Sequence, residues 1–355
     1  MPSIKDDRNC AARVSIGMPV YNGARFLREA LDSLLAQTFP DFELVISDNA
    51  STDDTESIVS EYARRDGRIR YVRQETNQGA AWNFNRVLEL ARCDYFKWAA
   101  ADDVCAPTFL AECVELLDRD PSVVCCHTRT RKINEAGEVL DHLDDPTDGG
   151  MPGRWFLGPH GPGRKRRDAS AVAAHRRFCD VLLSSGWAVR CAGVMRTAAL
   201  RQTTPMQPYY GSEKVTVAEM ALRGRFVDLP EMLFFQRVHE AASSHLATAE
   251  SQQQFFAARR PARRRSLRWQ LLRGHWQAIS LAPLAFSQRV LCRVWLVRYL
   301  LQASKWSHVV RSICQGRGVG GGAPCAPARP TPAPRLHWTE YAAPCQAPSE
   351  NLVHL

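Results

Sequence analysis

The 355-residue chain lacks several patterns that would assign it to common protein classes. Its 12 cysteines form no Cys-x-x-Cys pair, which argues against a zinc knuckle and against a thioredoxin-like redox centre. Scattered cysteines are typical of reduced thiols in the core of a cytosolic protein. No apolar stretch follows the charged N-terminal residues, and no run of about 18 uncharged apolar residues occurs. We therefore expect a cytoplasmic protein with neither a signal peptide nor a membrane-spanning helix.

Acidic residues are missing from residues 251–315, which hold 12 Lys or Arg together with several Trp and Tyr. The net charge of +9 arises at this end, because residues 1–250 carry 31 basic and 35 acidic side chains. A basic, aromatic-rich helical region suits the inner face of a membrane or a lipid-linked acceptor, although a plain solvated helical face has the same composition. Nucleic acid is a poorer partner, because no recognised nucleic-acid module accompanies the charge and phosphate would repel the acidic main domain.

The first half of the chain alternates strand and helix patterns. Short apolar runs predict strands, and apolar residues three or four positions apart predict the helices between them. The predicted strands are 14–19, 43–47, 69–73, 94–99 and 123–126, and the predicted helices are 26–35, 55–63, 80–91 and 107–117. Repeated β-α-β units require parallel strands with right-handed crossovers. We therefore predict an α/β fold with a Rossmann-like, doubly wound, mostly parallel sheet.

Composition also marks the domain boundaries. Gly, Pro and Arg dominate residues 144–177, which predicts an irregular insertion, and order returns with a strand, a helix and a strand at 189–195, 215–222 and 226–229. The last residues are rich in Pro, Gly and Ala, which indicates disorder. The predicted segments are an N-terminal tail (1–12), a main domain (13–245) with its insertion (144–177), a basic amphipathic helical extension (251–315) and a disordered tail (316–355).

Two adjacent carboxylates, Asp102 and Asp103, come directly after the predicted strand 94–99. Carboxylate oxygens are hard ligands that suit Mg²⁺ or Mn²⁺, which usually keep waters and substrate phosphates as their other ligands. A surface turn that caps the next helix would contain the same pair. Polar clusters also follow the first two strands, at 19–22 and 48–49. Because ligands bind beyond the carboxyl ends of parallel strands, we expect these clusters to converge on one cleft.

Five segments occur in a fixed order along the first half of the chain. They are VSIGMPVYN at 14–22, QTFPDFEL at 37–44, SDNASTD at 47–53, NQG at 77–79 and ADD at 101–103. Together they closely resemble the family 2 glycosyltransferases of the GT-A fold, in the nucleotide-diphospho-sugar transferase superfamily. The resemblance is strong over residues 13–135 and weaker over 185–240.

The resemblance implies a site for a nucleotide sugar. Asp103 would be the direct metal ligand, and Asp102 would contact the sugar or ribose. Family members usually carry two aspartates where this chain has Asp48 and Asn49, and Ala101 replaces a residue that is more often polar or acidic. The remaining residues that would line the nucleotide site or meet its base or ribose are Pro19, Tyr21, Asn22, Asp48, Asn49, Asn77, Gly79 and Ala80.

A segment in the second half resembles the part of the family that supplies the catalytic base. It reads GSEKV at 211–215, and the matching position is Glu213, where relatives more often have Asp. A lone exposed Glu is otherwise a solvated charge. Arg237 and His239 follow a predicted strand at 233–235 and are candidates for phosphate or metal contact, with an ordinary surface Arg and His as the alternative.

The resemblance therefore predicts a glycosyltransferase that depends on Mn²⁺ or Mg²⁺ and inverts the anomeric centre. The donor would be a UDP- or dTDP-sugar and the acceptor a saccharide or lipid-linked molecule, in the synthesis of a cell-surface polysaccharide or glycoconjugate. Ala101 and Glu213 leave open a non-catalytic nucleotide-sugar-binding protein. A nucleotidyltransferase on a similar sheet is a second alternative, disfavoured because residues 14–27 lack a Gly-rich run that could hold a triphosphate.

Overall fold

The structure is a computed structural model that describes residues 12–140, 169–183, 187–240, 242, 249–257 and 266–300. The predicted tails, residues 1–11 and 316–355, and most of the predicted insertion 144–177 lie outside the described residues. The elements in chain order are β1 (Val14–Val20), α1 (Ala24–Leu35), β2 (Phe42–Asp48), α2 (Thr55–Arg65), β3 (Ile69–Arg73), α3 (Ala80–Leu90), β4 (Tyr95–Trp98), β5 (Val104–Cys105), α4 (Phe109–Arg119), β6 (Val123–Ile133), α5 (Ala174–Leu183), the 3₁₀ helix η2 (Trp187–Ala192), β7 (Val194–Arg196), α6 (Thr197–Arg201), α7 (Ser212–Arg223), β8 (Arg225–Arg237), α8 (Ala249–Phe256), α9 (Leu267–Leu281) and α10 (Phe286–Leu300).

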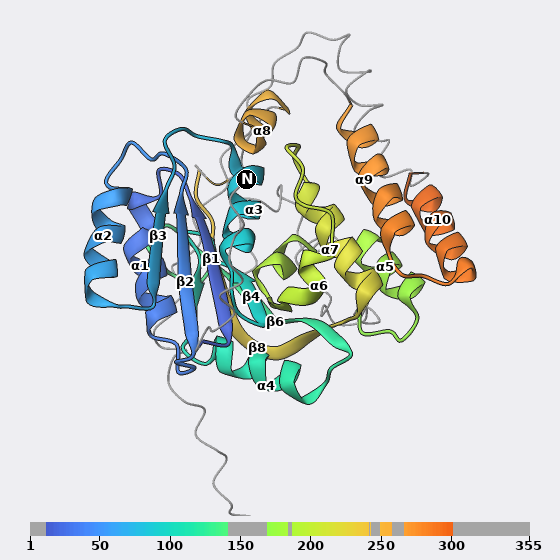
Figure 1. Ribbon diagram of the computed structural model, residues 1–355, viewed down its shortest axis with the longest axis horizontal. Helices are drawn as coiled ribbons and strands as arrows, with labels where there is room; N and C mark the ends of the chain where they lie inside the picture. Colours follow the sequence, from blue (N-terminus) through green and yellow to red (C-terminus); the bar gives the residue numbers. More distant parts are fainter. Residues whose placement is uncertain are drawn as a thin grey trace, which may run out of the picture.

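The strands of the described residues form one mixed sheet in the order β3-β2-β1-β4-β7-β6-β8-β5 (Figure 1). Strands β3, β2, β1 and β4 are parallel neighbours, and β6 and β8 are also parallel. Strand β7 runs antiparallel between β4 and β6, and β5 is antiparallel to β8. The α/β class and the mostly parallel sheet are therefore confirmed. The carboxyl ends of β1, β2 and β4 lie at the same edge.

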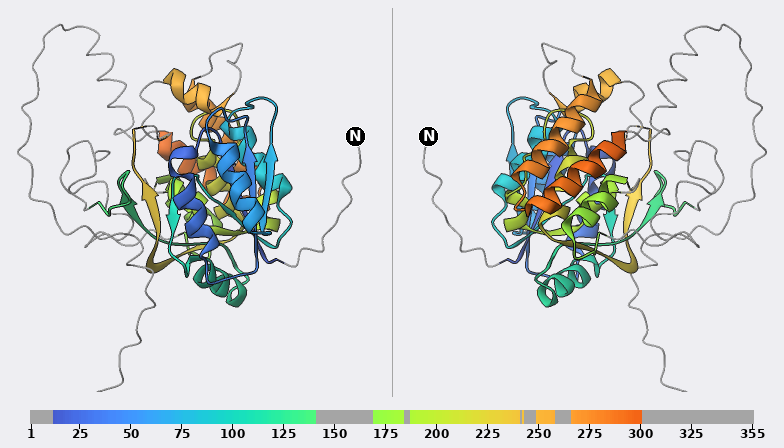
Figure 2. Two further views of the ribbon diagram at one scale, coloured as in Figure 1. Left: turned by 90° about the vertical axis from the view of Figure 1, so that its left-hand side faces the viewer. Right: turned by 90° about the vertical axis from the view of Figure 1, so that its right-hand side faces the viewer.

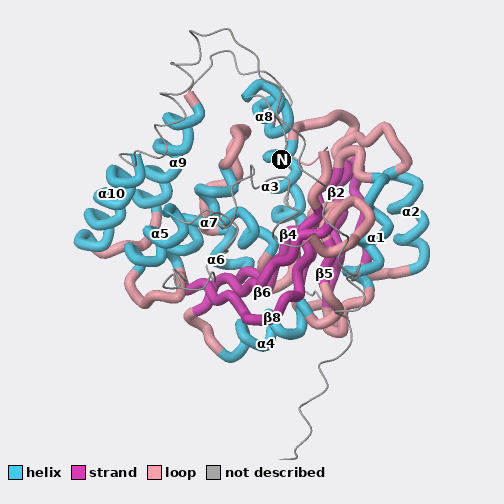
Figure 3. Tube along the Cα trace, turned by 180° about the vertical axis from the view of Figure 1, so that it is seen from behind, coloured by secondary structure: helices cyan, strands magenta, loops and turns pink. Residues whose placement is uncertain are grey.

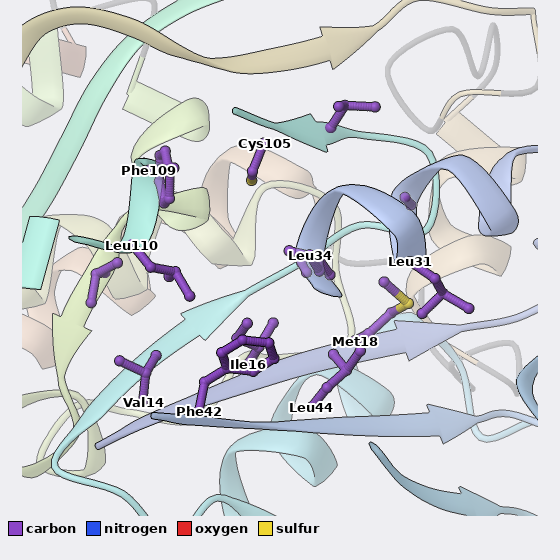
Figure 4. Packing of buried hydrophobic residues seen from close by; sticks show 14 of the residues in the cluster. Val14, Ile16, Met18, Leu31, Leu34, Phe42, Leu44, Cys105, Phe109 and Leu110 are labelled. Carbon is purple, nitrogen blue, oxygen red and sulfur yellow. The ribbon is translucent and has the colours of Figure 1, made fainter. Parts of the chain in front are cut away.

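Alternation along β1 explains the core on one face of the sheet. Ile16 and Met18 lie below Leu31 and Leu34 of α1, and Val14 lies on the same face nearer Leu110 of α4 (Figure 4). Side chains two positions apart in a strand share a face, and those three or four apart in a helix share a stripe. Helices α1, α2 and α4 cover this face, and α3, α5 and α7 cover the opposite face.

Gly17 of β1 allows helix α3 to pack closely on the sheet. A Cβ on Gly17 of β1 would lie 2.8 Å from side-chain atoms of both Phe96 and Val87. Phe96 belongs to the neighbouring strand β4 and Val87 to α3. A side chain at position 17 would therefore push α3 away from the edge where the polar clusters lie.

Several boundaries in the second half differ from the sequence-based expectation. The predicted strand 189–195 is the helix η2 followed by the short strand β7. The chain turns there because Gly193 donates its amide to the Arg190 carbonyl over 3.1 Å, and a Cβ on Gly193 would lie 2.6 Å from the Cys126 carbonyl oxygen. The predicted strands 226–229 and 233–235 are one strand, β8. Helix α5 begins at Ala174, inside the segment predicted to be irregular.

Helices α9 and α10 form the C-terminal helical extension. Helix α9 packs on α7, and α10 packs on α5 and α9. The pair lies side by side at the end of the molecule remote from α1 and α2 (Figures 2 and 3). Among the helices of the described ranges, none combines the length and apolarity that crossing a bilayer requires.

Candidate functional site

The loops that follow β1 and β2 are joined by hydrogen bonds at the carboxyl edge of the sheet. The Asn22 amide donates to Ser51 Oγ over 2.9 Å, and the Thr52 amide donates to Asn22 Oδ1 over 2.8 Å. Asn22 adopts a φ of 52°, a left-handed conformation that asparagine tolerates better than most residues. Pro19 is half-buried beside this turn, and Tyr21 is 49% exposed. Tyr21 can therefore contact a ligand at this edge.

Asp48, at the end of β2, is completely buried. Its Oδ1 accepts the Ser51 amide over 2.8 Å, and its Oδ2 accepts the Tyr71 hydroxyl over 2.7 Å. Arg73 lies 3.5 Å from the same Oδ2. Burial and the Asp48 carboxylate together raise the pKa of the Tyr71 phenol. The carboxylate predicted to meet the base or ribose thus holds its own loop in place.

Asn49 is also buried, and its side chain holds the loop that precedes α3. Its Nδ2 donates to Asn77 Oδ1 over 2.9 Å and to the Gly79 carbonyl over 3.2 Å, and its Oδ1 accepts the Gln78 amide over 2.9 Å. An aspartate at this position could accept but not donate. Gly79 has a φ of 86°, which favours glycine, and Ala80 then starts α3. Asn77 is exposed at the edge of the site.

The Asp102-Asp103 turn lies against the loop after β1. A Cβ on Gly23 would lie 3.2 Å from the Cβ of Ala101, so a larger residue at either position would separate the two loops. His239 Nε2 lies 2.9 Å from Asp102 Oδ2, and the His239 ring packs at a tilt against the Phe26 ring, with centroids 4.8 Å apart. The turn and the polar loops after β1 and β2 therefore converge, as the sequence predicted.

Arg237, predicted to contact phosphate or metal, is hydrogen-bonded to the Asp102-Asp103 turn. Its backbone amide donates to Asp103 Oδ1 and its Nε donates to the Asp102 carbonyl, both over 2.9 Å. The other guanidinium nitrogens pair with the Asn134 and Glu135 carbonyls and with the Glu29 carboxylate. The Arg237 side chain has 0% exposed surface. Each guanidinium nitrogen therefore has a protein partner, and contact of Arg237 with phosphate or metal stays a prediction.

The electrostatics of the turn favour a cation. Burial and then the neighbouring Asp102 charge raise the pKa of Asp103, and Lys97 and Arg237 oppose this rise. Two carboxylates that repel each other are both better accommodated beside a divalent ion. Within the described ranges, no group of three or more His, Cys, Asp or Glu could hold a metal alone. The pair fits a hard ion whose remaining ligands come from a diphosphate and water.

Glu213 lies in the first turn of α7, and burial together with its charge raises the pKa of the Cys191 thiol, next to Ala192 in the chain. Burial raises the pKa of Glu213, and its Oε2 is buried without a hydrogen-bond partner. Helix α7 packs on η2, where the Ala192 carbonyl accepts the Lys97 ammonium over 2.6 Å. Lys97 thus connects the surroundings of Glu213 with those of Asp103.

A cleft of about 330 Å³ opens beside the start of α7. Its polar lining comes mainly from the segment before α7, from α7 and from α9: Gln207, Tyr209, Ser212, Gln270 and Arg273. Burial and the nearby Glu213 carboxylate raise the pKa of Tyr209 to about 12. A second cavity of about 190 Å³ shares Thr204, Pro205 and Thr216 with the first. The recess could hold a hydroxylated molecule, and Glu213, although it is not among the lining residues, lies near Tyr209 of that lining.

Two supporting residues were not predicted from the sequence. Lys97 is 1% exposed, lies 4.7 Å from the Phe109 ring centroid and donates to the Trp98 and Ala192 carbonyls. Asn83 of α3 donates to the Ser47 carbonyl over 2.8 Å and to the Val20 carbonyl over 3.3 Å, which joins the ends of β1 and β2. A polar residue within an otherwise apolar stretch is the signal that marks both positions.

Comparison with known proteins identifies the family. The sequence model described as Glycosyl transferase family 2 matches residues 15–176, which include the converging loops after β1, β2 and β4. Residues 15–176 are therefore a domain of glycosyltransferase family 2. Its members are sugar-transferring enzymes, and the resemblance predicted from the five segments is confirmed.

Curated relatives match about a third of this chain. It is 32% identical to a chondroitin synthase of Escherichia coli over 129 residues, which is 36% of this chain and 19% of the relative. It is 35% identical to the putative glycosyltransferase EpsE of Bacillus subtilis over 112 residues, 31% of this chain and 40% of the relative. The family 2 chain thus matches well under half of the length of either relative.

Solved structures extend the similarity to most of the family 2 chain. S. aureus TarS 1-349 in complex with UDP-GlcNAc has a TM-score of 0.56 at 18% identity, covering 80% of this chain and 71% of that one. The complex of the same protein with UDP has a TM-score of 0.55 at 18% identity, covering 83% and 74%. At this identity the likeness shows the fold alone, and it confirms the predicted GT-A class.

Proposed function

We propose that this family 2 protein transfers a sugar from a nucleotide diphosphate sugar to a hydroxyl of a saccharide or lipid-linked acceptor. The observation that carries the proposal is the convergence of three loops on one sheet edge. The loops after β1 and β2 are hydrogen-bonded to each other, and Ala101 beside the two carboxylates packs against Gly23. Ligands of doubly wound sheets bind at this edge.

On the donor side, the chain supplies a preformed frame for a nucleotide diphosphate. Tyr21 and Asn77 are exposed at the rim, while Asp48 and Asn49 hold the loops beneath it. Mn²⁺ or Mg²⁺ bound by Asp103 would stabilise the negative charge of the departing diphosphate. The Arg237 backbone amide donates a hydrogen bond to the Asp103 carboxylate, and the His239 ring contacts the Asp102 carboxylate. Neither residue must contact phosphate to serve the reaction, because each orients a carboxylate.

On the acceptor side, we propose that Glu213 removes the proton of the attacking hydroxyl. A base is required because the hydroxyl loses its proton as it attacks the anomeric carbon. The pKa of Glu213 is raised by burial, which brings a carboxylate closer to neutral pH, and its Oε2 has no partner. The polar cleft beside α7 would hold the acceptor. Attack from the face opposite the leaving group inverts the anomeric centre.

The donor and the cellular location are also proposals. Complexes of S. aureus TarS with UDP and with UDP-GlcNAc support a UDP-sugar, with a dTDP-sugar as the other member of the expected class. The cysteines at the described positions 93, 105, 113, 125, 126, 179, 191 and 292 form no disulfide. Thiols outside disulfides suit a reducing compartment, which supports a cytoplasmic protein. Synthesis of a cell-surface polysaccharide or glycoconjugate fits such a location.

A screen of nucleotide sugars for hydrolysis in Mn²⁺ and Mg²⁺ tests the proposal. We expect at least one UDP- or dTDP-sugar to be hydrolysed by the wild-type chain, and the rate to fall in Asp103→Asn and Glu213→Gln. A non-catalytic binding protein would be stabilised by UDP without any turnover. A nucleotidyltransferase would instead consume a sugar 1-phosphate with a nucleoside triphosphate, and either result would contradict sugar transfer.

A further inference from the structure

Helix α10 exposes an apolar face that no element of the described residues covers. Phe286, Val290, Val294 and Val297 recur three or four positions apart, so they share one face of the helix. Their exposed fractions are 80%, 40%, 57% and 52%. The opposite face of α10 holds the buried residues Cys292 and Leu296, which pack against the protein. Helix α10 is therefore apolar on both sides, although only one side is covered.

Helix α9 extends this face with aromatic residues. Trp269 and Trp276 lie seven positions apart on α9, and both are exposed. The Arg293 guanidinium lies 4.5 Å from the Trp276 ring centroid, which joins the exposed sides of α9 and α10. Leu281, at the end of α9, and Phe286, at the start of α10, are both exposed. The docking face, as we call these residues, thus runs along both helices on the outside of the molecule (Figure 2).

The charged side chains of α9 and α10 all have one sign. Arg289, Arg293 and Arg298 border the apolar stripe of α10, Arg268 lies on α9, and Arg273 of α9 lines the cleft beside α7. The sequence contains no Asp or Glu from position 251 to position 300. Tryptophan and arginine beside aliphatic side chains are the composition of helices that lie in a membrane interface. Negatively charged lipid headgroups would complement the arginines.

We propose that the docking face binds the surface of an anionic lipid bilayer, with α9 and α10 lying flat in the headgroup region. The inference deepens the proposed function by naming the partner of a surface remote from α1 and α2. A second copy of the chain fits less well, because pairing the same face twice would oppose arginine to arginine. Neither α9 nor α10 is long and apolar enough to span a bilayer.

Vesicle binding of the full-length chain tests this inference without nucleotide or acceptor, so that its failure leaves sugar transfer untouched. Vesicles of phosphatidylcholine mixed with phosphatidylglycerol should sediment the wild-type protein, and vesicles of phosphatidylcholine alone should sediment much less. Phe286→Ser combined with Val294→Ser should weaken binding about tenfold or more, because two exposed apolar side chains no longer enter the interface. Val172→Ser is the matched control, since Val172 is 91% exposed but lies outside the docking face.

A spectroscopic readout separates lipid contact from a general loss of folding. Tryptophan emission should shift to shorter wavelength when anionic vesicles are added, and Trp269→Phe with Trp276→Phe should reduce that shift while leaving the melting temperature within about 2 °C. Equal sedimentation of wild-type and Phe286→Ser/Val294→Ser protein would overturn the inference. A wild-type dimer that becomes monomeric in the same variant would overturn it in favour of self-association.

Discussion

Asn49 donates its side-chain amide to Asn77 Oδ1 over 2.9 Å, and this bond holds the loop before α3 against the end of β2. Relatives of this family usually carry an aspartate at the position of Asn49. Here the same amide group also donates to the Gly79 carbonyl over 3.2 Å. The loop in this chain therefore depends on a donor that a carboxylate cannot provide.

Asn49→Asp should for this reason weaken the fold and the donor site together. A carboxylate would face two oxygen acceptors, so we expect a loss of about 1–3 kcal/mol in the free energy of unfolding and weaker stabilisation by UDP. Denaturant unfolding with and without UDP measures both effects. Gln78→Glu adds the same charge in the same loop and should leave stability nearly unchanged. Equal stability of wild-type and Asn49→Asp protein would contradict the role of the amide.

Asp103→Asn should remove turnover while leaving the fold intact. The loss of a ligand to the divalent ion should lower the rate at least about 100-fold, because charge on the departing diphosphate is then poorly stabilised. The shift in melting temperature caused by UDP in Mn²⁺ should disappear as well. Asp94→Asn, at an exposed position before β4, serves as the control. If Mn²⁺ raises the melting temperature equally in both variants, Asp103 does not bind the ion.

Glu213→Gln should make the protein more stable at neutral pH and inactive. Burial raises the pKa of Glu213, so its contribution to stability is complete only at acidic pH and is lost as the pH rises through the raised value. Glutamine has no charged form, so the melting temperature should rise by about 1–3 °C at pH 7 and by less near pH 4. Melting curves at the two pH values measure this difference.

The pH dependence of the wild-type rate should also report the ionisation of Glu213. Activity should fall toward acidic pH with an apparent pKa above the ordinary value of glutamate, because protonated Glu213 cannot accept a proton. Glu231→Gln, at an exposed position of β8, should change neither the melting temperature nor the rate. A Glu213→Gln variant that keeps its turnover would show that another group is the base.

Gly274→Ala should disturb the cleft beside α7. A Cβ at this position of α9 would lie 2.6 Å from the Tyr209 hydroxyl and 2.9 Å from a Val215 side-chain atom. Helix α9 must then move away from α7, which should cost about 1–3 kcal/mol of stability. Gly67→Ala is the matched control, because a Cβ there meets nothing within 4 Å. Chemical denaturation of the two variants compares the costs, and equal midpoints would contradict the packing of α9 on α7.

The sequence alone determined the elements that a local pattern of apolar residues marks. A short apolar run at 14–19 predicted β1, and four-residue spacing in 26–35 predicted α1, because a buried strand is apolar throughout and a helix with one buried face shows its period locally. The polar clusters at strand ends predicted which loops would meet, since parallel strands place their carboxyl ends together. The five ordered segments then indicated the family and its fold.

Tertiary structure decided what each polar side chain does. Ligand contacts were predicted for Arg237, Asp48 and Asn49. In the structure, each of these side chains forms hydrogen bonds with residues that are distant in the sequence. Lys97 is buried because carbonyls of Trp98 and Ala192 receive its ammonium group. The predicted strand 189–195 became η2 and β7 because Gly193 packs against the Cys126 carbonyl. Partners of this kind are set by the packing of distant segments, and no local pattern of residues contains them.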